Sequence, residues 1–218
     1  MEIEIEIPAS YLAVLKLFAA KNDIRPALNG VSVEVGPHET HLFASDGTRV
    51  AGFRVVSEQP DLVEPLKDIS IPIEMLPQRS EKHIVQITIG EQIDVGYSRS
   101  IALQAFLADG ATKAGPTTLG KTLDAPGMDF RKALSSKLSG ETAQFNPTFF
   151  ADFVKAAKLL GVNPAFITVT HNGDGPALVT LDGREDFVGA MSPILGHPQT
   201  CFPAWAGAPL LARKQEAA

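Results

Sequence analysis

The stretches Arg25-Pro-Ala-Leu-Asn-Gly30 and Ser45-Asp-Gly-Thr-Arg-Val-Ala51 decide the fold of this chain. Apolar residues at alternate positions follow the first stretch and flank the second, which is typical of half-buried β-strands. Asp46-Gly47 separates two such runs, and Asp-Gly between strands favours a two-residue type I′ hairpin. The pattern predicts three successive antiparallel strands, at Val31–Val35, Leu42–Ser45 and Thr48–Val56.

The composition is that of a water-soluble chain with enough apolar residues for a core. The 218 residues are 44% hydrophobic, which suits one or two packed domains. The net charge of −6 argues against bulk attraction to phosphate, so a nucleic-acid contact needs a local basic cluster. Cys201 is the single cysteine, which excludes an internal disulfide. The start, Met1–Ile7, is no signal peptide, and no apolar run approaches the ~20 residues that span a bilayer, so we expect a cytoplasmic protein.

A strand and a helix are expected before these three strands. Glu2–Ile7 alternates charged and β-branched residues, which predicts a half-buried strand. Pro8 suits the entry to a helix and Ser10 can cap it, so we expect a helix at Ser10–Lys21. Its apolar face would consist of Tyr11, Leu12, Leu15, Phe18 and Ala19.

The same order recurs after the connector at Pro60–Pro65. The second copy would contain a strand at Asp68–Ile73, a short helix at Glu74–Ser80 that Pro77 interrupts, and strands at Ile84–Ile89, Gln92–Tyr97 and Ser100–Leu107. Ala111–Gly127 is rich in Gly, Thr, Pro and Ala, which indicates a loop or linker. Asp129–Leu134 predicts a short helical or extended link.

A third copy completes the repeat of strand, helix and three strands. Asn146 is a good N-cap, Pro147 suits the first helical position, and Gly161 suits the residue after the helix. We expect Phe150 and Phe153 of this helix to face a sheet. The other elements are a strand at Glu141–Phe145, strands at Phe166–His171, Ala177–Leu181 and Phe187–Met191, a turn at Asn172–Gly175 and an irregular tail from Gly196.

Several motifs of the chain resemble the bacterial DNA polymerase III β subunit, the sliding clamp. Asp23–Val31 and Ala44–Ala51 match the patterns D-x-R-x-x-L-N-G-V and A-S/T-D-G-x-R-V/L-A of its middle domain. Met128–Ala133 is similar to its P-D-Y-R-R-V segment. Phe145–Leu159 and Val188–Leu195 resemble two segments of the second half of its third domain.

The resemblance implies an α+β, DNA-clamp-like fold of repeated units with antiparallel sheets backing the helices. The expected organisation is a clamp-like domain at 1–110, a linker at 111–140, half a clamp-like domain at 141–195 and a tail at 196–218. No part of the chain matches the family's first domain or the first half of its third domain. The chain is therefore a shortened and divergent clamp relative, and we expect a homo-oligomer.

Two sites follow from the resemblance. Clamps bind linear peptides of polymerases and repair proteins in an apolar cleft, which here would be lined by Leu28, Gly47, Thr48, Arg49, Val50, Lys132, Ala133, Met191, Pro193 and Ile194. The residue types alone are equally those of a core, and Asp in place of Val50 or Met191 separates the alternatives: it removes peptide binding from a groove but unfolds a core. Phe202 and Trp205 of the tail could occupy the same groove.

The helices of clamps present basic residues to duplex phosphates without reading bases. The candidates here are Lys16, Lys21, Arg25, Lys155 and Lys158, and the alternative is that they lie on a solvated helix face.

Little in the sequence indicates catalysis, a cofactor or a metal. His38 and His41 lie close together with Glu39, but two further ligands cannot be placed. Cys201 has no base that the sequence places nearby. We therefore expect no enzyme but a processivity-factor relative, a scaffold that tethers partners and contacts DNA independently of sequence. The alternative is a peptide-binding module or decoy that does not bind DNA, and a membrane is not expected as a partner of either.

Overall fold

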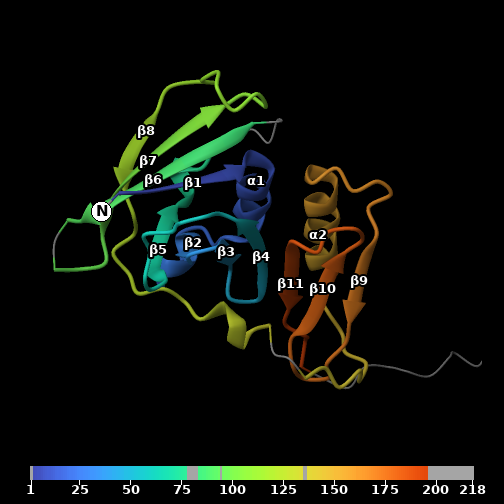
Figure 1. The fold of residues 1–218 in the computed structure, drawn as a ribbon. Helices are drawn as coiled ribbons and strands as arrows, with labels where there is room; N and C mark the ends of the chain where they lie inside the picture. The colour runs from blue at the N-terminus through green and yellow to red at the C-terminus, as the bar shows by residue number, and fades with distance from the viewer. Residues whose placement is uncertain (1, 78–82, 94, 135–136, 196–218) are drawn as a thin grey trace, which may run out of the picture.

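The computed structural model describes residues 2–77, 83–93, 95–134 and 137–195, so the expected tail at 196–218, with Cys201, Phe202 and Trp205, lies outside the described residues. The strands form two antiparallel sheets, and two α-helices pack on one face of the larger sheet (Figure 1). The fold is α+β, as the sequence predicted. No helix in the described part of the chain is long and apolar enough to cross a membrane.

The elements follow the predicted order of three units. The first unit contains β1 (Ile3–Pro8), α1 (Ala9–Phe18), the 3-10 turn η1 (Pro26–Asn29), β2 (Gly30–Val35), β3 (Glu39–Ser45) and β4 (Arg49–Val56). The second contains β5 (Leu66–Pro72), η2 (Ile73–Met75), β6 (Ile84–Gln92), β7 (Arg99–Phe106) and β8 (Thr118–Lys121). After η3 (Phe130–Lys132), the third contains α2 (Pro147–Leu159), β9 (Ile167–Thr170), β10 (Ala177–Leu181) and β11 (Phe187–Met191).

The first two units exchange their first strands. β1 pairs with β6 of the second unit, with Pro8 opposite Ile84, and β5 pairs with β2 of the first unit, with Pro72 opposite Gly30. The smaller sheet has the order β1-β6-β7-β8, and β5-β2-β3-β4 forms part of the larger one. Because the inward side chains of both sheets meet, the two units share one apolar core.

The third unit joins the first by extending the larger sheet. β11 pairs antiparallel with β4, which gives the order β5-β2-β3-β4-β11-β10-β9. α1 and α2 lie side by side over this seam (Figure 1), with the ring centroids of Phe18 and Phe153 4.8 Å apart. Phe153 is fully buried, as expected, whereas Phe150 is only half-buried and packs edge-on against Phe145.

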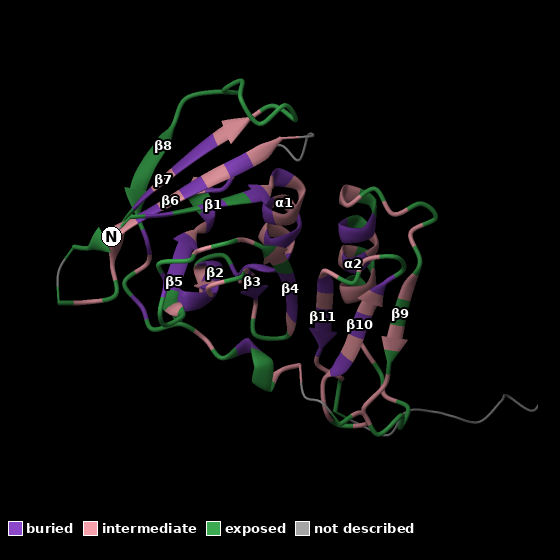
Figure 2. Ribbon diagram, viewed as in Figure 1, coloured by how far each residue is buried: buried purple, intermediate pink, exposed green. Residues whose placement is uncertain are grey.

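Apolar side chains are also buried on the face of the larger sheet that is opposite the helices. Phe43, Val50 and Ala190 of β3, β4 and β11 are covered there by Phe130 of η3, which stacks on Phe43 with ring centroids 5.4 Å apart. We call this group, with Met128, Ala133, Leu134 and Val188 around it, the outer cluster. The connector between the second and third units is therefore packed onto the sheet, whereas β8 is exposed along its length (Figure 2).

The capping signals of the second helix are confirmed. The Asn146 side chain accepts a hydrogen bond from the Thr148 N–H at 3.0 Å, and Gly161 has a φ of +73°. The Val162 N–H reaches back to the Ala157 carbonyl at 2.9 Å, which closes the helix in the manner of a Schellman motif.

The start of the first helix lies within one residue of the prediction, but its cap and its end were predicted wrongly. α1 begins at Ala9, directly after Pro8, so Ser10 lies inside the helix and does not cap it. The helix ends at Phe18 rather than Lys21 because Ala19 is extended and the Ala20 N–H donates to the Leu28 carbonyl of η1. A tertiary contact thus replaces the last turn that the sequence pattern favoured.

The strands of the second unit also differ from the prediction. β6 continues through the expected turn at Gly90-Glu91 with an irregular register and ends at Gln92, and the described residues of the strand expected at Gln92–Tyr97 form no separate strand. The last strand is instead β8, which pairs with β7 inside the range expected to be a linker. Its residues are all exposed, so they carry no alternating apolar signal.

Two further local predictions were wrong. Glu141–Phe145 is not a strand and makes one isolated bridge, between Gln144 and Ile194. Asp46-Gly47 is not a two-residue turn, because the last facing pair is Ser45 and Val50, which leaves four residues in the connection. Only Gly47 has positive φ there, whereas a type I′ turn needs two such residues.

Candidate functional site

A small cleft lies where the first and third units meet. Its walls come from the connection between β3 and β4, from the end of β11 and from the connector after η3. The Ser192 N–H donates to the Thr48 carbonyl at 2.7 Å, which ties the end of β11 to that connection. The cleft has a volume of about 50 Å³, room for one small side chain.

Six of the ten residues predicted for peptide binding line this one cleft: Gly47, Thr48, Arg49, Val50, Ala133 and Met191. They come from three separate segments of the chain, so their convergence is produced by the fold. Sequence reasoning missed four lining residues, Ser45, Pro176, Ala190 and Ser192. Three of these flank predicted positions in the sequence, which was an available signal, whereas Pro176 lies on the approach to β10 and gave none.

The other four predicted residues do not line the cleft. Leu28 of η1 is fully buried, and Lys132 points into solvent with its side chain 84% exposed. Pro193 is half-buried, and Ile194 is 53% exposed beside Gln144. Leu28 is therefore a core residue in this structure.

Val50 and Met191 form the floor of the cleft and are themselves part of the interior. Val50 is 2% exposed and belongs to the outer cluster. Met191 is fully buried and belongs to the core on the helix face. A ligand in the cleft would touch only the outermost atoms of these side chains, so the accessible walls are Thr48, Ala133 and the backbone at Gly47.

The turn that forms one wall is fixed by the Asp46 carboxylate. Its Oδ1 accepts hydrogen bonds from the N–H groups of Thr48 at 2.9 Å and Arg49 at 3.1 Å. Burial acts to raise the pKa of Asp46, but these hydrogen bonds outweigh it, and the pKa lies below its ordinary value. Gly47, with φ of +90°, packs against the Arg25 guanidinium, so a side chain at this position would both strain the turn and displace Arg25.

Arg49 joins the two units instead of standing free at the rim. Its side chain is 13% exposed and pairs with Asp46 of the turn and with Asp152 of α2. Its guanidinium carbon lies 5.4 Å from the ring centroid of Phe18 and 5.2 Å from that of Phe149. Burial acts to raise the pKa of Asp152, but hydrogen bonds from Lys155 and Arg49 more than offset it. The functional group of Arg49 is thus committed to holding α2 beside α1.

A second group of polar contacts between the first and third units lies at the other end of the β4–β11 pairing. The Tyr11 hydroxyl of α1 donates to Asp186, which also forms a two-pronged ion pair with Arg184 at 2.7 and 2.8 Å. The Arg184 guanidinium holds the pKa of the Asp186 carboxyl below its ordinary value, whereas burial and the neighbouring Asp186 raise the pKa of Tyr11. These contacts and the ion pairs of Arg49 hold the third unit against the first.

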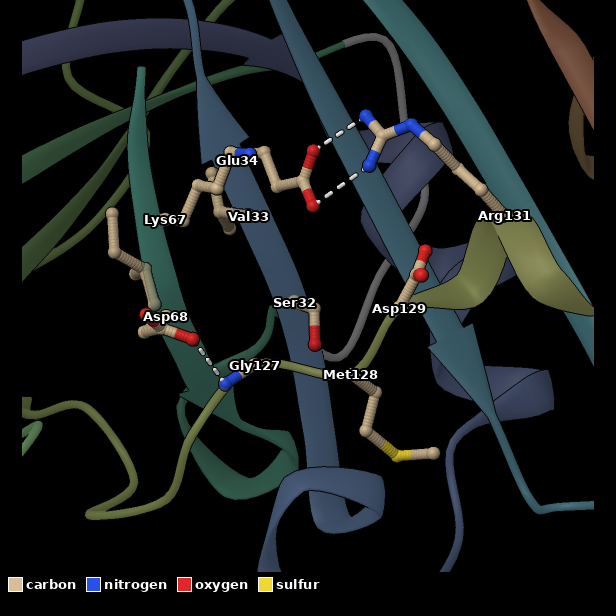
Figure 3. Close-up of a pocket in the computed structure, with 10 residues that line it drawn as sticks. Ser32, Val33, Glu34, Lys67, Asp68, Gly127, Met128, Asp129 and Arg131 are labelled. Atoms are coloured by element: carbon tan, nitrogen blue, oxygen red, sulfur yellow. Dashed lines mark hydrogen bonds and ion pairs between the residues drawn. The ribbon is translucent and has the colours of Figure 1, made fainter. Parts of the chain in front are cut away.

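The connector that carries Ala133 is tied to the outer face of the sheet by polar contacts. Figure 3 shows Arg131 reaching across β3 to Glu34 of β2, with an N–O distance of 3.0 Å for one of the two bonds. The Gly127 N–H donates to Asp68 of β5 at 2.6 Å. A pocket of about 480 Å³ lies between these anchors, and the Arg131 guanidinium holds the pKa of Glu34 below its ordinary value.

A further pocket of about 420 Å³ lies on the same face, beyond the outer cluster. Phe43, Leu134 and Val188 give it an apolar base. His41, Arg54, Arg131 and Glu185 lie among the residues that surround this base. No signal in the sequence indicated this pocket, because its residues come from β3, β4, the connector, the turn before β11 and β11 itself.

The basic residues predicted to face DNA are only partly available. Lys155 pairs with Asp152 at 2.9 Å and Arg25 pairs with Asp23 at 2.9 Å. Lys16 is half-buried and donates to the Leu76 carbonyl at 3.4 Å. Within residues 2–77, 83–93, 95–134 and 137–195, no ion pair joins Lys21 or Lys158 to an acid.

Two histidines of the described residues, His38 and His41, each contact a glutamate side chain. His38 contacts Glu58 at 3.0 Å, and His41 contacts Glu39 at 2.9 Å. Over the described ranges, no three His, Cys, Asp or Glu side chains are close enough together to hold a metal ion.

The fold is that of the DNA polymerase sliding clamps. The Streptococcus pyogenes β subunit superposes with a TM-score of 0.62 at 11% sequence identity, covering 88% of this chain and 66% of that one. The Pseudomonas aeruginosa clamp solved with a ligand gives a TM-score of 0.61 at 16% identity, with the same coverage. A P. aeruginosa clamp bound to griselimycin gives 0.53 at 14% identity.

The likeness is one of structure. No family model matches the sequence, and a search of curated proteins finds no match. The chain spans 66% of the length of the clamps it matches first.

Proposed function

We propose that the chain is a sliding-clamp-like scaffold, not an enzyme, that tethers partner proteins in the cytoplasm through a short-peptide site at the seam of β4 and β11. The observation that carries the proposal is the convergence of six predicted residues from three segments on one cleft. The clamp fold and the griselimycin complex of a P. aeruginosa clamp support it. The partners would be linear peptides of polymerase or repair proteins.

The chemistry of the cleft favours an apolar anchor followed by an extended backbone. The floor consists of Val50, Met191 and Ala190, and the carbonyl groups of Gly47 and Thr48 can accept hydrogen bonds from a peptide, whereas their N–H groups are already bonded to Ser45 and Asp46. A side chain the size of Leu exceeds about 50 Å³, so we propose that the connector at Ala133 shifts outward when an anchor enters. Burying such an anchor contributes about 1.5–3 kcal/mol before ordering costs.

Substitution of Ala133 by Arg should abolish this binding. Ala133 is half-buried on the connector, so a long charged side chain would fill the mouth of the cleft without entering the core. We expect the Kd of a fluorescent peptide with Leu and Phe anchors to rise at least tenfold, equivalent to about 1.4 kcal/mol. Fluorescence anisotropy measures it.

The matched control is Ala108→Arg, the same change at an exposed position beyond β7 in the smaller sheet. A peptide with both anchors replaced by Ala should not bind either protein. Unchanged affinity of the Ala133→Arg protein would contradict the assignment of this cleft.

Contact with duplex DNA is the second part of the proposal. Its alternative is a peptide-binding module that does not bind DNA. Lys21 and Lys158 are the two predicted cations whose side chains form neither an ion pair nor a hydrogen bond within the described part of the chain, so few counterions would be released. We expect weak, sequence-independent binding whose log K falls with log salt concentration with a slope of about −2 per chain. Titrations of labelled duplex at several salt concentrations measure this slope.

The double variant Lys21→Glu, Lys158→Glu should remove the binding, whereas Lys113→Glu in the second unit should not. Peptide binding without measurable duplex binding at low salt would favour the alternative, a peptide-binding module or decoy. Tight, base-specific binding that survives high salt would contradict both readings.

A further inference from the structure

The first of the three strands of the third unit has an uncovered edge, whereas the corresponding strand of the first unit is covered by another strand. On β2, the inward side chains Val31 and Val33 are 0% and 1% exposed. On β9, which has the same place in its unit, the inward side chains Ile167 and Val169 are only half-buried, and the neighbouring Phe166 is 62% exposed. The difference arises because β5 covers the edge of β2, whereas β9 is the last strand of its sheet (Figure 1).

The missing element can be inferred from the exchange of first strands. In the first two units, the strand directly before the helix crosses to the first of the three strands of the other unit. In the third unit, the segment directly before α2 is 141–145, which forms no strand and crosses to no other unit among the described residues. Gln144 makes a bridge to Ile194, the Glu141 carbonyl accepts from the Gly173 N–H at 2.9 Å, and the Ala143 N–H donates to the His171 ring at 3.1 Å. An exchange would replace the last two contacts, which lie just beyond the end of β9, and β9 receives no strand from another unit within the described residues.

We propose that two copies of this chain complete a clamp domain by exchanging these segments: residues 141–145 of each copy pair antiparallel with β9 of the other. The contact is isologous, because each copy gives the same segment and offers the same edge, so a two-fold axis closes it. It turns two half-domains into one domain with a shared core, as β1 and β5 do within the chain. The inference goes beyond the proposed function and does not depend on peptide or DNA binding.

The register of the exchange follows from the side chains. The residues two positions before the first helical residue, Ile7 and Ile71, both point inward and are fully buried. Phe145 holds this position before α2, and pairing it with Ile167 of the other copy places Ala143 opposite Val169. Apolar residues then face apolar residues on the inner side. Since side chains alternate, the same register places the exposed Gln144 opposite the exposed Thr168.

Disulfide trapping between two different variants tests this register directly. In a Cys201→Ser background, one protein carries Gln144→Cys and the other carries Thr168→Cys. Directly opposed residues in an antiparallel pair lie within disulfide reach. We expect a cross-linked dimer under mild oxidation only when the two proteins are mixed, and little from either one alone.

Thr180→Cys mixed with Gln144→Cys is the matched control. Thr180 is the direct neighbour of Thr168 on β10, one strand further from the edge, so it should cross-link much more slowly. Equal trapping at positions 168 and 180, or none at either, would overturn the proposal.

The solution mass gives an independent measurement. Light scattering of the full chain at micromolar concentration should give twice 23.2 kDa. Val169→Lys should halve this mass and Thr168→Lys should not, with circular dichroism confirming that both remain folded. A monomeric full chain that dimerises only when residues 196–218 are deleted would mean that the tail covers the edge, and would overturn the exchange. If Val169→Lys fails to fold, the disulfide experiment decides.

Discussion

Replacing Met191 by Asp should unfold the protein rather than simply remove peptide binding. Met191 is fully buried in the core on the helix face, and it lies at the end of the strand that joins the third unit to the first. An Asp carboxylate there would lose its hydration without gaining a described partner, and we expect a destabilisation above about 4 kcal/mol. Urea unfolding followed by circular dichroism measures it.

Met191→Leu is the control, because it keeps the volume and apolar character and should cost less than about 1.5 kcal/mol. The result decides between the two interpretations that the sequence left open for this residue. A Met191→Asp protein that kept its stability and lost only peptide binding would show that the side chain belongs to a surface groove. Binding is better tested at Ala133, which lines the cleft without being interior.

The parts of the fold that the sequence predicted are those fixed by local chemistry. The ends of α2 depend on an Asn cap, a Pro in the first turn and a Gly of positive φ, all of which act within a few residues. The strands β2, β10 and β11 carry clear apolar runs, and the structure places them within one residue of the prediction. The order of the units followed from these elements.

The parts that the sequence did not predict depend on partners far away in the chain. β8 forms because β7 offers an edge, although its own side chains are all exposed. The segment 141–145 has the alternation of a strand but no strand beside it in the chain, so it does not become one. α1 ends early because the Ala20 N–H donates to the Leu28 carbonyl of η1 instead of continuing the helix.

The candidate site also combines features that the local sequence predicted with features that depend on residues far away in the chain. Gly47, Thr48, Arg49 and Val50 were predicted as one motif, and they lie together because they are contiguous. The role of Arg49 was not predictable, because Asp152, its partner on α2, lies in another unit. The pockets beside the connector were missed for a related reason: Arg131 packs onto the sheet through Glu34 and Phe43, which are distant in sequence.

Phe153→Ala should detach the third unit from the first. The ring is fully buried between Phe18 of α1 and Phe187 of β11, with centroid distances of 4.8 and 6.4 Å. The backbone at Gly189 leaves room for it, since an added Cβ would overlap the ring. Truncating a buried Phe costs about 3–5 kcal/mol, and we expect that loss in urea unfolding.

Phe150→Ala is the matched comparison on the same helix. Because Phe150 is half-buried and packs on Phe145, its loss should cost only about 1 kcal/mol. Equal losses of stability for the two variants would contradict the idea that packing against α1 and β11 is the main support of α2. The cleft is built across that seam, so the Phe153→Ala protein should also lose peptide affinity while the first two units, which are joined by the exchanged strands β1 and β5, remain folded. A single cooperative transition that includes β1 and β6 would show instead that the three units unfold as one.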